Sequence, residues 1–239
     1  MAPDITLFFL NASRSIRIAF LLEALNLPYT LISADRAPNG LAPPDFKARI
    51  RAAGQSLGKS PTLLDGDLVI AESGAIVEYL LEVYDTEHTL MPPLGDAAGR
   101  AKVREWVHAA EGGFMMPAMP VLYTRWQVPE HVPDRDQLLA VVEKKLSANV
   151  HNSFDWLEGQ LKAQKAQGSG WLVGQGLTAA DVVLQFSVQF IMERKLGVGG
   201  REEGKWPEVV AWLERTEAVE AYRKAVSKTG YSLDGNFRK

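Results

Sequence analysis

The fold of this chain is decided by residues 57–80, which read LGKSPTLLDGDLVIAESGAIVEYL. Two short apolar runs at residues 61–64 and 68–70 flank an Asp-Gly pair, and such a pair between apolar runs is a strong β-hairpin signal. After the hairpin, apolar side chains recur at helical spacing on a face made by Ile76, Val77, Leu80, Leu81 and Tyr84. The stretch therefore predicts two antiparallel strands followed by a helix that begins at residues 72–74.

Toward the N-terminus, the residues predict a strand, a helix and a second strand. Residues 5–10 form a short apolar run bounded by Asp4 and Asn11, which is typical of a buried strand. Helical spacing then extends from residue 13 to residue 26, and residues 29–33 predict the second strand. Because a whole helix separates these two strands, we expect them to be parallel. With a short helix at 45–51, the order up to residue 84 is βαβαββα.

Beyond residue 84 the pattern changes to helices alone. Residues 85–99 form a linker with a Pro-Pro pair and a glycine, where a border between compact units is expected. Kinks or stops are predicted at Pro117 and Pro120. The predicted helices span residues 100–116, 136–167, 179–196 and 207–227. The sequence thus predicts an α/β domain at residues 1–86, a linker at 87–98 and an all-α domain at 99–239.

The composition excludes several classes of function. The chain has 239 residues and a formal net charge of −3, so it offers no basic field for nucleic acid or an anionic membrane. It contains no cysteine, and therefore no disulfide, thiolate metal site or cysteine nucleophile. Its apolar runs are too short to span a bilayer, and its first residues lack the features of a secretory signal. We expect a cytoplasmic protein without a nucleic-acid or membrane partner, whose thiol chemistry uses an external thiol.

Two motifs carry a resemblance to a known family. Residues 57–80 look like the glutathione-site signature of the cytosolic glutathione S-transferase superfamily, in its usual order and spacing. Residues 171–181, WLVGQGLTAAD, resemble the helical-domain signature of the same superfamily. Residues 11–17, NASRSIR, are similar to the Ser-Arg-containing version of fungal and bacterial members. The resemblance covers nearly the whole chain and implies a thioredoxin-like N-terminal domain followed by a helical bundle domain.

The resemblance also implies an activity. It implies a glutathione S-transferase, an enzyme that uses glutathione as co-substrate or cofactor and holds no metal. Such an enzyme activates the thiol of glutathione and adds it to a small hydrophobic electrophile, in detoxification and as a cytoplasmic homodimer. Two alternatives stay open. One is a glutathione-dependent isomerase, lyase or dehalogenase of a small-molecule pathway, and the other is a non-catalytic glutathione-binding scaffold.

The resemblance implies a set of glutathione-binding residues, namely Arg14, Lys59, Ser60, Pro61, Glu72 and Ser73. In the family the bond before Pro61 is cis, which would leave the Ser60 backbone free to pair with the cysteinyl part of glutathione. The Ser73 N–H can receive the γ-glutamyl carboxylate while Glu72 faces the ammonium. Lys59 can meet the glycyl carboxylate, and Arg14 can face the glutathione backbone. The structural alternatives are a strand-initial proline, a helix cap and a solvated loop lysine.

Thiol activation needs a donor aimed at the sulfur, because a free thiol with a pKa of about 8.5 is mostly protonated at neutral pH. A hydroxyl or amide near a helix N-terminus stabilises the thiolate. The resemblance makes Ser13 the first candidate for this contact and Asn11 the second, since tyrosine is absent before Tyr29. Ser13 is equally suited to be the helix N-cap, and Arg17 is interpreted as a structural or interfacial arginine.

In the family the electrophile lies against the first helices of the second domain. The corresponding candidates here are His108, Glu111, Phe114, Met115 and Tyr123. The alternative for each aromatic residue or methionine is a place in the core. His108 and Glu111 have no third ligand at helical spacing, so we expect no metal site. The pair Thr178 and Asp181 has the spacing of a capping box, for which we expect a purely structural role.

Overall fold

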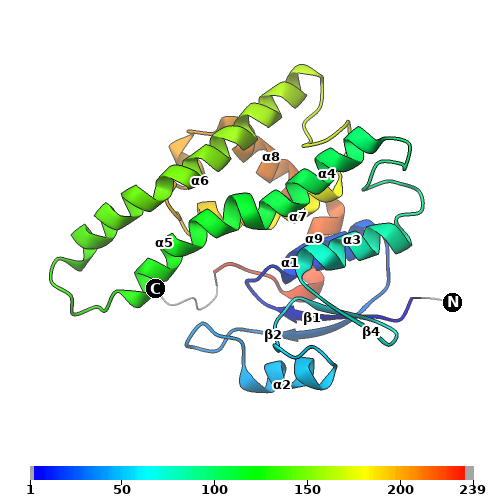
Figure 1. Ribbon diagram of the computed structural model, residues 1–239, viewed down its shortest axis with the longest axis horizontal. Helices are drawn as coiled ribbons and strands as arrows, with labels where there is room; N and C mark the ends of the chain where they lie inside the picture. Colours follow the sequence, from blue (N-terminus) through cyan, green and yellow to red (C-terminus); the bar gives the residue numbers. More distant parts are fainter. Residues whose placement is uncertain (1–2, 235–239) are drawn as a thin grey trace. The chain divides into compact units, whose positions relative to one another are not determined.

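The computed structural model describes residues 3–234, which divide into two compact units (Figure 1). The sheet unit contains residues 3–91 together with 217–234, and the helical unit contains residues 92–216. The division after residue 91 falls inside the predicted linker. The segment from residue 217 onward, however, was predicted to belong to the helical domain. It belongs to the sheet unit because α9 (Glu220–Thr229) packs along α1 (Ser15–Ala24).

The sheet has four strands in the order β2-β1-β3-β4. Their bounds are β1 Ile5–Leu10, β2 Thr30–Ala34, β3 Thr62–Asp65 and β4 Leu68–Ala71. β1 pairs with β2 in parallel, while β3 is antiparallel to both β1 and β4. With α1, α2 (Pro44–Ala52) and α3 (Ser73–Tyr84), this confirms the predicted βαβαββα order and the hairpin at the Asp-Gly pair.

β1 is buried on both faces of the sheet, which explains why all of its residues except Thr6 are apolar. On one face Phe8 and Leu10 pack with Phe46 and Ile50 of α2. The side chains that alternate with them along the strand, Ile5, Leu7 and Phe9, are also fully buried. The end of β1 is therefore held in place by core packing, and the loop that follows begins at this rigid strand.

The helical unit is built from α4 to α8. The bounds are α4 Ala97–Ala109, a π-helical turn Ala110–Met115, α5 Met116–Gln127, α6 Arg135–Ala166, α7 Ala179–Glu193, a 3₁₀ turn Arg201–Glu203 and α8 Pro207–Glu217. Kinks or stops were predicted at Pro117 and Pro120. Pro117 lies in the first turn of α5, directly after the π-helical turn, and Pro120 lies inside α5, so neither proline ends this helix. The single helix predicted over residues 207–227 is two helices, since Val219 takes an extended conformation with ψ of 133°.

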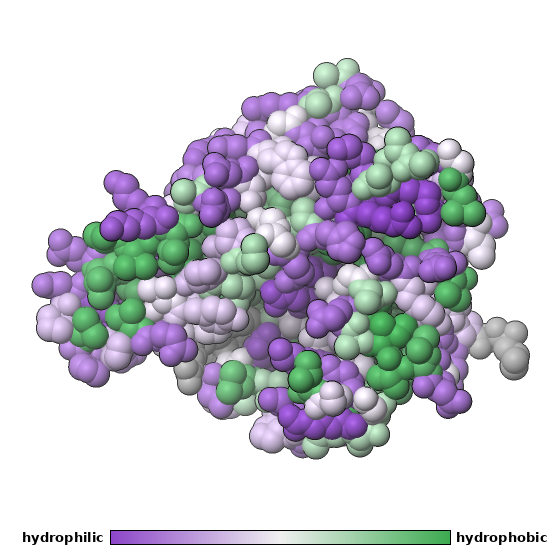
Figure 2. All heavy atoms as spheres, in the orientation of Figure 1, coloured by the Kyte–Doolittle hydropathy of each residue, from purple (hydrophilic) through white to green (hydrophobic). Residues whose placement is uncertain are grey.

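α5 and α6 form a hairpin that is stabilised by hydrogen bonds of the Arg125 side chain. Its guanidinium donates to both carboxylate oxygens of Glu143 at 2.6 and 2.8 Å, and to the carbonyls of Arg194 and Lys195 at 2.7 Å each. Figure 2 shows apolar atoms gathered over this hairpin, where Leu138 and Val141 are exposed. Among the helices that the structure describes, none is long and apolar enough to cross a bilayer.

Asp181, in the first turn of α7, is the polar centre of the helical unit. Its buried carboxylate accepts hydrogen bonds from the N–H groups of Leu172 and Thr178, the Thr178 hydroxyl and the Trp212 indole, at 2.8–3.0 Å. Burial raises the pKa of Asp181, and these hydrogen bonds oppose the rise. Since every one of these partners is a donor, the ionised carboxylate fits the site. The predicted capping box between Thr178 and Asp181 is confirmed.

We expect Asp181→Ala to lower the free energy of unfolding by about 3 kcal/mol, because it leaves several buried donors without an acceptor. Asp155→Ala is the matched control. Asp155 also accepts from an indole N–H, that of Trp206 at 2.7 Å, but it is exposed, so water replaces it and the loss should stay below about 1 kcal/mol. Urea unfolding followed by circular dichroism measures both. Equal losses for the two variants would contradict the central role of Asp181.

Candidate functional site

Ser13 lies in the loop between β1 and α1 and is almost completely buried, with 7% of its surface exposed. Its hydroxyl donates to the Leu10 carbonyl at 2.7 Å and accepts the backbone N–H of Ser15 at 3.2 Å. The second contact engages a free N–H at the start of α1, but the N-cap of this helix is Arg14, so the N-cap interpretation of Ser13 was wrong by one residue. The hydroxyl therefore sits at the positive end of the helix dipole.

A chain of serine hydroxyls connects Ser13 with the loop before β3. The Oγ atoms of Ser13 and Ser15 are 2.9 Å apart, and those of Ser15 and Ser60 are 2.7 Å apart. Ser60 Oγ donates to the Phe8 carbonyl at 2.7 Å and accepts the Leu10 N–H at 3.0 Å. Two residues implied by the resemblance, Ser13 and Ser60, are thus brought together through a third, Ser15, that the sequence analysis did not select.

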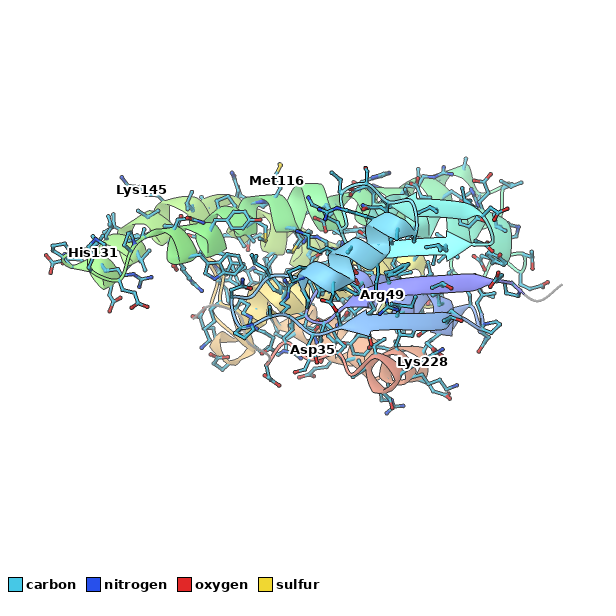
Figure 3. The ribbon with its side chains drawn as sticks, turned by 90° about the horizontal axis from the view of Figure 1, so that it is seen from below. Asp35, Arg49, Met116, His131, Lys145 and Lys228 are labelled. Atoms are coloured by element: carbon cyan, nitrogen blue, oxygen red, sulfur yellow. The ribbon has the colours of Figure 1, made fainter. Side chains whose placement is uncertain are left out.

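Asn11 holds the same loop from the other side. Its Nδ2 donates to the Asp35 carboxylate at 3.0 Å and to the Gly230 carbonyl at 3.2 Å. Its Oδ1 accepts the N–H of Ala12 at 2.7 Å and that of Ser232 at 3.1 Å. Figure 3 labels Asp35 just after the end of β2. An amide has two donor hydrogens and two acceptor positions, so Asn11 has no donor left for a sulfur atom.

Glu72 and Ser73 lie at the junction of β4 and α3. Glu72 is exposed and has φ of 68°, a conformation that costs a residue other than glycine about 1–3 kcal/mol and that occurs mainly at functional sites. Ser73 is the first residue of α3 and is buried. Its N–H therefore belongs to the group of amides at a helix start that attract an anion.

Arg17 contacts this junction from α1. The side chain is 1% exposed, and its Nη1 donates to Ser73 Oγ at 3.1 Å. Because the Ser73 oxygen accepts from Arg17, its own hydrogen is directed elsewhere and can serve an anion. The sequence interpretation of Arg17 as structural or interfacial missed this contact. The available signal was an arginine inside a run in which every other residue from Ser15 to Leu22 is uncharged.

The loop before β3 presents the remaining glutathione candidates. The Ser60-Pro61 bond is cis. The paired part of β3 begins at Thr62, whose hydroxyl donates to the Lys59 carbonyl at 2.7 Å, so Ser60 precedes the ladder. The Lys59 side chain is exposed, and the backbone N–H of Lys59 donates to the Gln55 amide oxygen at 3.2 Å. Arg14 precedes the first residue of α1 and is half-buried.

The electrophile-binding candidates of the helical unit fall into two groups, one accessible to solvent and one buried. His108 and Tyr123 are exposed and Glu111 is half-buried. Phe114 and Met115 are at most 1% exposed, and the Phe114 ring lies 5.9 Å from that of Phe154. In this structure Phe114 and Met115 are core residues, as the alternative interpretation of aromatic and methionine side chains at helical spacing proposed.

Glu111, Phe114 and Met115 lie in the π-helical turn, and two hydroxyls hold that turn. Ser187 of α7 donates to the Ala110 carbonyl at 2.9 Å, and Ser153 of α6 donates to the Gly113 carbonyl at 2.6 Å. Turns of this kind are frequent at functional sites. In residues 3–234, no three histidine or acidic side chains cluster in a way that could hold a metal ion.

Comparison with known proteins identifies both parts of the chain. A glutathione S-transferase N-terminal domain model matches residues 3–82, and a glutathione S-transferase C-terminal domain model matches residues 114–220. Glutathione S-transferase 1 of Saccharomyces cerevisiae is 29% identical over 98% of this chain and 99% of its own length. A solved glutathione S-transferase of Actinobacillus pleuropneumoniae is 34% identical with a TM-score of 0.76, covering 96% of this chain and 94% of that one.

A further structure shows the fold together with a ligand. The glutathione transferase homologue of Lodderomyces elongisporus was solved with two GSH per subunit. It has a TM-score of 0.71 and covers 94% of this chain and 98% of its own, at 22% identity.

We expect Asn11→Ala to lower the free energy of unfolding by about 2 kcal/mol, since it removes an amide that joins β1, β2 and the segment after α9. Asn39→Ala is the control. Asn39 is exposed and accepts one N–H, that of Leu41 at 3.0 Å, so its loss should cost less than about 0.5 kcal/mol. Thermal and urea unfolding give the comparison. An Asn11→Ala protein as stable as the parent would show that the amide does not brace the loop.

Proposed function

The chain belongs to the glutathione S-transferase family and is an enzyme of that family, and on this premise we propose that it makes the glutathione thiolate and adds it to a hydrophobic electrophile. The observation that carries the proposal is the Ser13 hydroxyl, held at the N-terminal end of α1 and linked to Ser60 through Ser15. A hydroxyl there lowers the pKa of a bound thiol by donating to the charged sulfur.

Ser13 is proposed as the sulfur contact in preference to Asn11. The single Ser13 hydrogen is directed to the Leu10 carbonyl, and rotation about the Cβ–Oγ bond re-aims it without moving the backbone. Both Asn11 donors, by contrast, serve oxygens on other segments of the chain, so re-aiming them would release β2 or the segment after α9. The helix dipole adds to the effect of the Ser13 hydroxyl because it favours negative charge at the same position.

The amino-acid head group of glutathione is proposed to bind at the start of α3. The Ser73 N–H and hydroxyl would receive the γ-glutamyl carboxylate, with the buried charge of Arg17 directly behind the hydroxyl. The exposed Glu72 carboxylate would face the ammonium. Ser60 and Pro61 would support the cysteinyl backbone, and the cations of Lys59 and Arg14 would meet the remaining carboxylate and backbone groups.

The electrophile is proposed to contact the accessible side chains of the helical unit, His108, Glu111 and Tyr123. Phe114 and Met115 would not contact the electrophile. Their buried side chains would set the shape of the π-helical turn that carries Glu111. A cytoplasmic location and a homodimer belong to the same proposal, because they are the usual state of the family. Size-exclusion chromatography with light scattering tests the dimer directly.

The first test is retention on immobilised glutathione followed by turnover of a generic aryl halide. We expect binding and turnover, with glutathione consumed in proportion to product. Failure to bind would contradict the assignments of Ser60, Ser73 and Glu72 together. Turnover with full recovery of free glutathione would point instead to glutathione as a cofactor, as in a dehalogenase. Binding without turnover of the aryl halide would favour the isomerase, lyase or scaffold alternatives.

The second test is Ser13→Ala. We expect kcat with the aryl halide to fall about tenfold at a pH well below the pKa of the bound thiol, because there a rise of one unit in that pKa leaves about a tenth of the thiolate. The KM for glutathione should change little, since the head group binds at Ser73. Ser33→Ala, an exposed serine of β2, is the control and should keep the parent rate. An unchanged pH–rate profile in Ser13→Ala would exclude Ser13 as the sulfur contact.

A further inference from the structure

We propose that Ser15 is a positioning residue for thiol activation, which donates its hydroxyl hydrogen to Ser13 and thereby directs the Ser13 hydrogen toward the sulfur. The inference rests on the proposed function of Ser13. Ser15 is the first residue of α1 and is 0% exposed. Its Oγ lies between the Oγ atoms of Ser13 and Ser60, at 2.9 and 2.7 Å.

The number of hydrogens in this hydroxyl chain is smaller than the number of short contacts. The contacts run from the Leu10 carbonyl through Ser13, Ser15 and Ser60 to the Phe8 carbonyl, so four oxygen–oxygen pairs lie within 2.7–2.9 Å. The three hydroxyls supply three hydrogens, and a carbonyl supplies none. One contact is therefore always without a hydrogen, and the chain has no single preferred direction while both of its ends are carbonyl acceptors.

A thiolate beside Ser13 would remove this ambiguity. Its negative charge is a stronger acceptor than a carbonyl, so the hydrogens would turn one way, from Ser60 to Ser15, from Ser15 to Ser13, and from Ser13 to sulfur. The change needs only rotation about carbon–oxygen bonds, and no proton leaves its oxygen. Hydrogen bonds aligned in a chain strengthen one another, so the Ser13 hydrogen becomes a better donor when Ser13 itself accepts from Ser15.

The position of Ser15 supports this role over simple packing. The rest of α1 up to Leu22 is buried and, apart from Arg17, apolar, so an alanine would satisfy the packing of a small side chain here. Burying a hydroxyl costs free energy unless it is hydrogen-bonded, and both of the contacts around Ser15 Oγ lead to proposed glutathione-site residues. Ser15 thus joins the sulfur end of the site to the loop before β3.

The test is a double-mutant cycle with Ser13→Ala, Ser15→Ala and the double variant. In each protein, the pKa of bound glutathione is measured from the ultraviolet absorbance of the thiolate and from the pH dependence of kcat/KM. Ser15→Ala should raise that pKa by about half a unit and lower kcat/KM at neutral pH about threefold, with KM for glutathione unchanged. In the Ser13→Ala background the same substitution should have no further effect.

Two more variants separate positioning from loss of stability. Ser15→Thr keeps the hydroxyl and should restore the parent pKa of bound glutathione. Ser169→Ala removes another buried hydroxyl, one that donates to the Gly174 carbonyl at 2.6 Å in the helical unit, and should lower stability without changing that pKa. Both comparisons are made after unfolding curves have confirmed that each variant is folded.

The outcomes distinguish this inference from the proposed function. If the parent protein neither binds nor turns over glutathione, the proposed function fails first. If the parent is active but the effects of Ser13→Ala and Ser15→Ala on the pKa add independently, Ser15 does not act through Ser13 and the inference is overturned. An unchanged pKa in Ser15→Ala, or equal shifts in the alanine and threonine variants, overturns it as well.

Discussion

The backbone of Leu10 is the anchor on which the candidate site depends. Leu10 ends β1, a strand buried on both faces, and its carbonyl accepts from Ser13 while its N–H donates to Ser60. Two loops that are about fifty residues apart in sequence are therefore fixed to one peptide group. Because β1 is locked by apolar packing on either side, neither loop can shift without disturbing the core. The burial of a strand thus supplies the precision that the proposed thiol chemistry would require.

Two of the non-glycine residues with positive φ lie next to candidate glutathione-site residues. Ala12 and Glu72 both have positive φ, 52° and 68°, although neither is glycine. Ala12 is held in this conformation from both ends, by the Asn11 side chain at its N–H and by Arg36 at its carbonyl, at 2.7 and 3.0 Å. Such conformations persist only where the surroundings over-determine them. At Ala12 the surroundings are the side chain of the neighbouring Asn11 and that of Arg36, which follows β2, and the result is a loop that presents Ser13 at the start of α1.

The polar side chains around the candidate site are of two kinds, those whose hydrogen bonds are all committed and those that can change their partner. Asn11 has all its hydrogen-bonding capacity committed to neighbouring segments, so it serves the architecture. Ser13 and Ser15 have hydroxyls that can turn, and Arg17 carries a charge next to the free N–H groups of α3. A side chain that can change its partner suits a site that must be complementary to a charge only while the ligand is bound. This distinction separates structural from functional candidates more sharply than burial alone.

The sequence by itself determined the elements up to residue 84, their order and the family, since periodicity, the Asp-Gly turn and the two motifs are local signals that survive without a structure. It also determined that β1 and β2 are parallel. In the helical part it did not predict α5 as a helix or separate α8 from α9. Only the tertiary structure supplied the contacts behind the proposed choice of Ser13 over Asn11 and the proposed roles of Ser15 and Arg17, and only it placed α9 in the sheet unit. The physical reason is that these depend on contacts between residues far apart in the chain. The bond from Ser232 to Asn11 spans 221 residues and that from Arg17 to Ser73 spans 56, and no periodic pattern encodes such pairs.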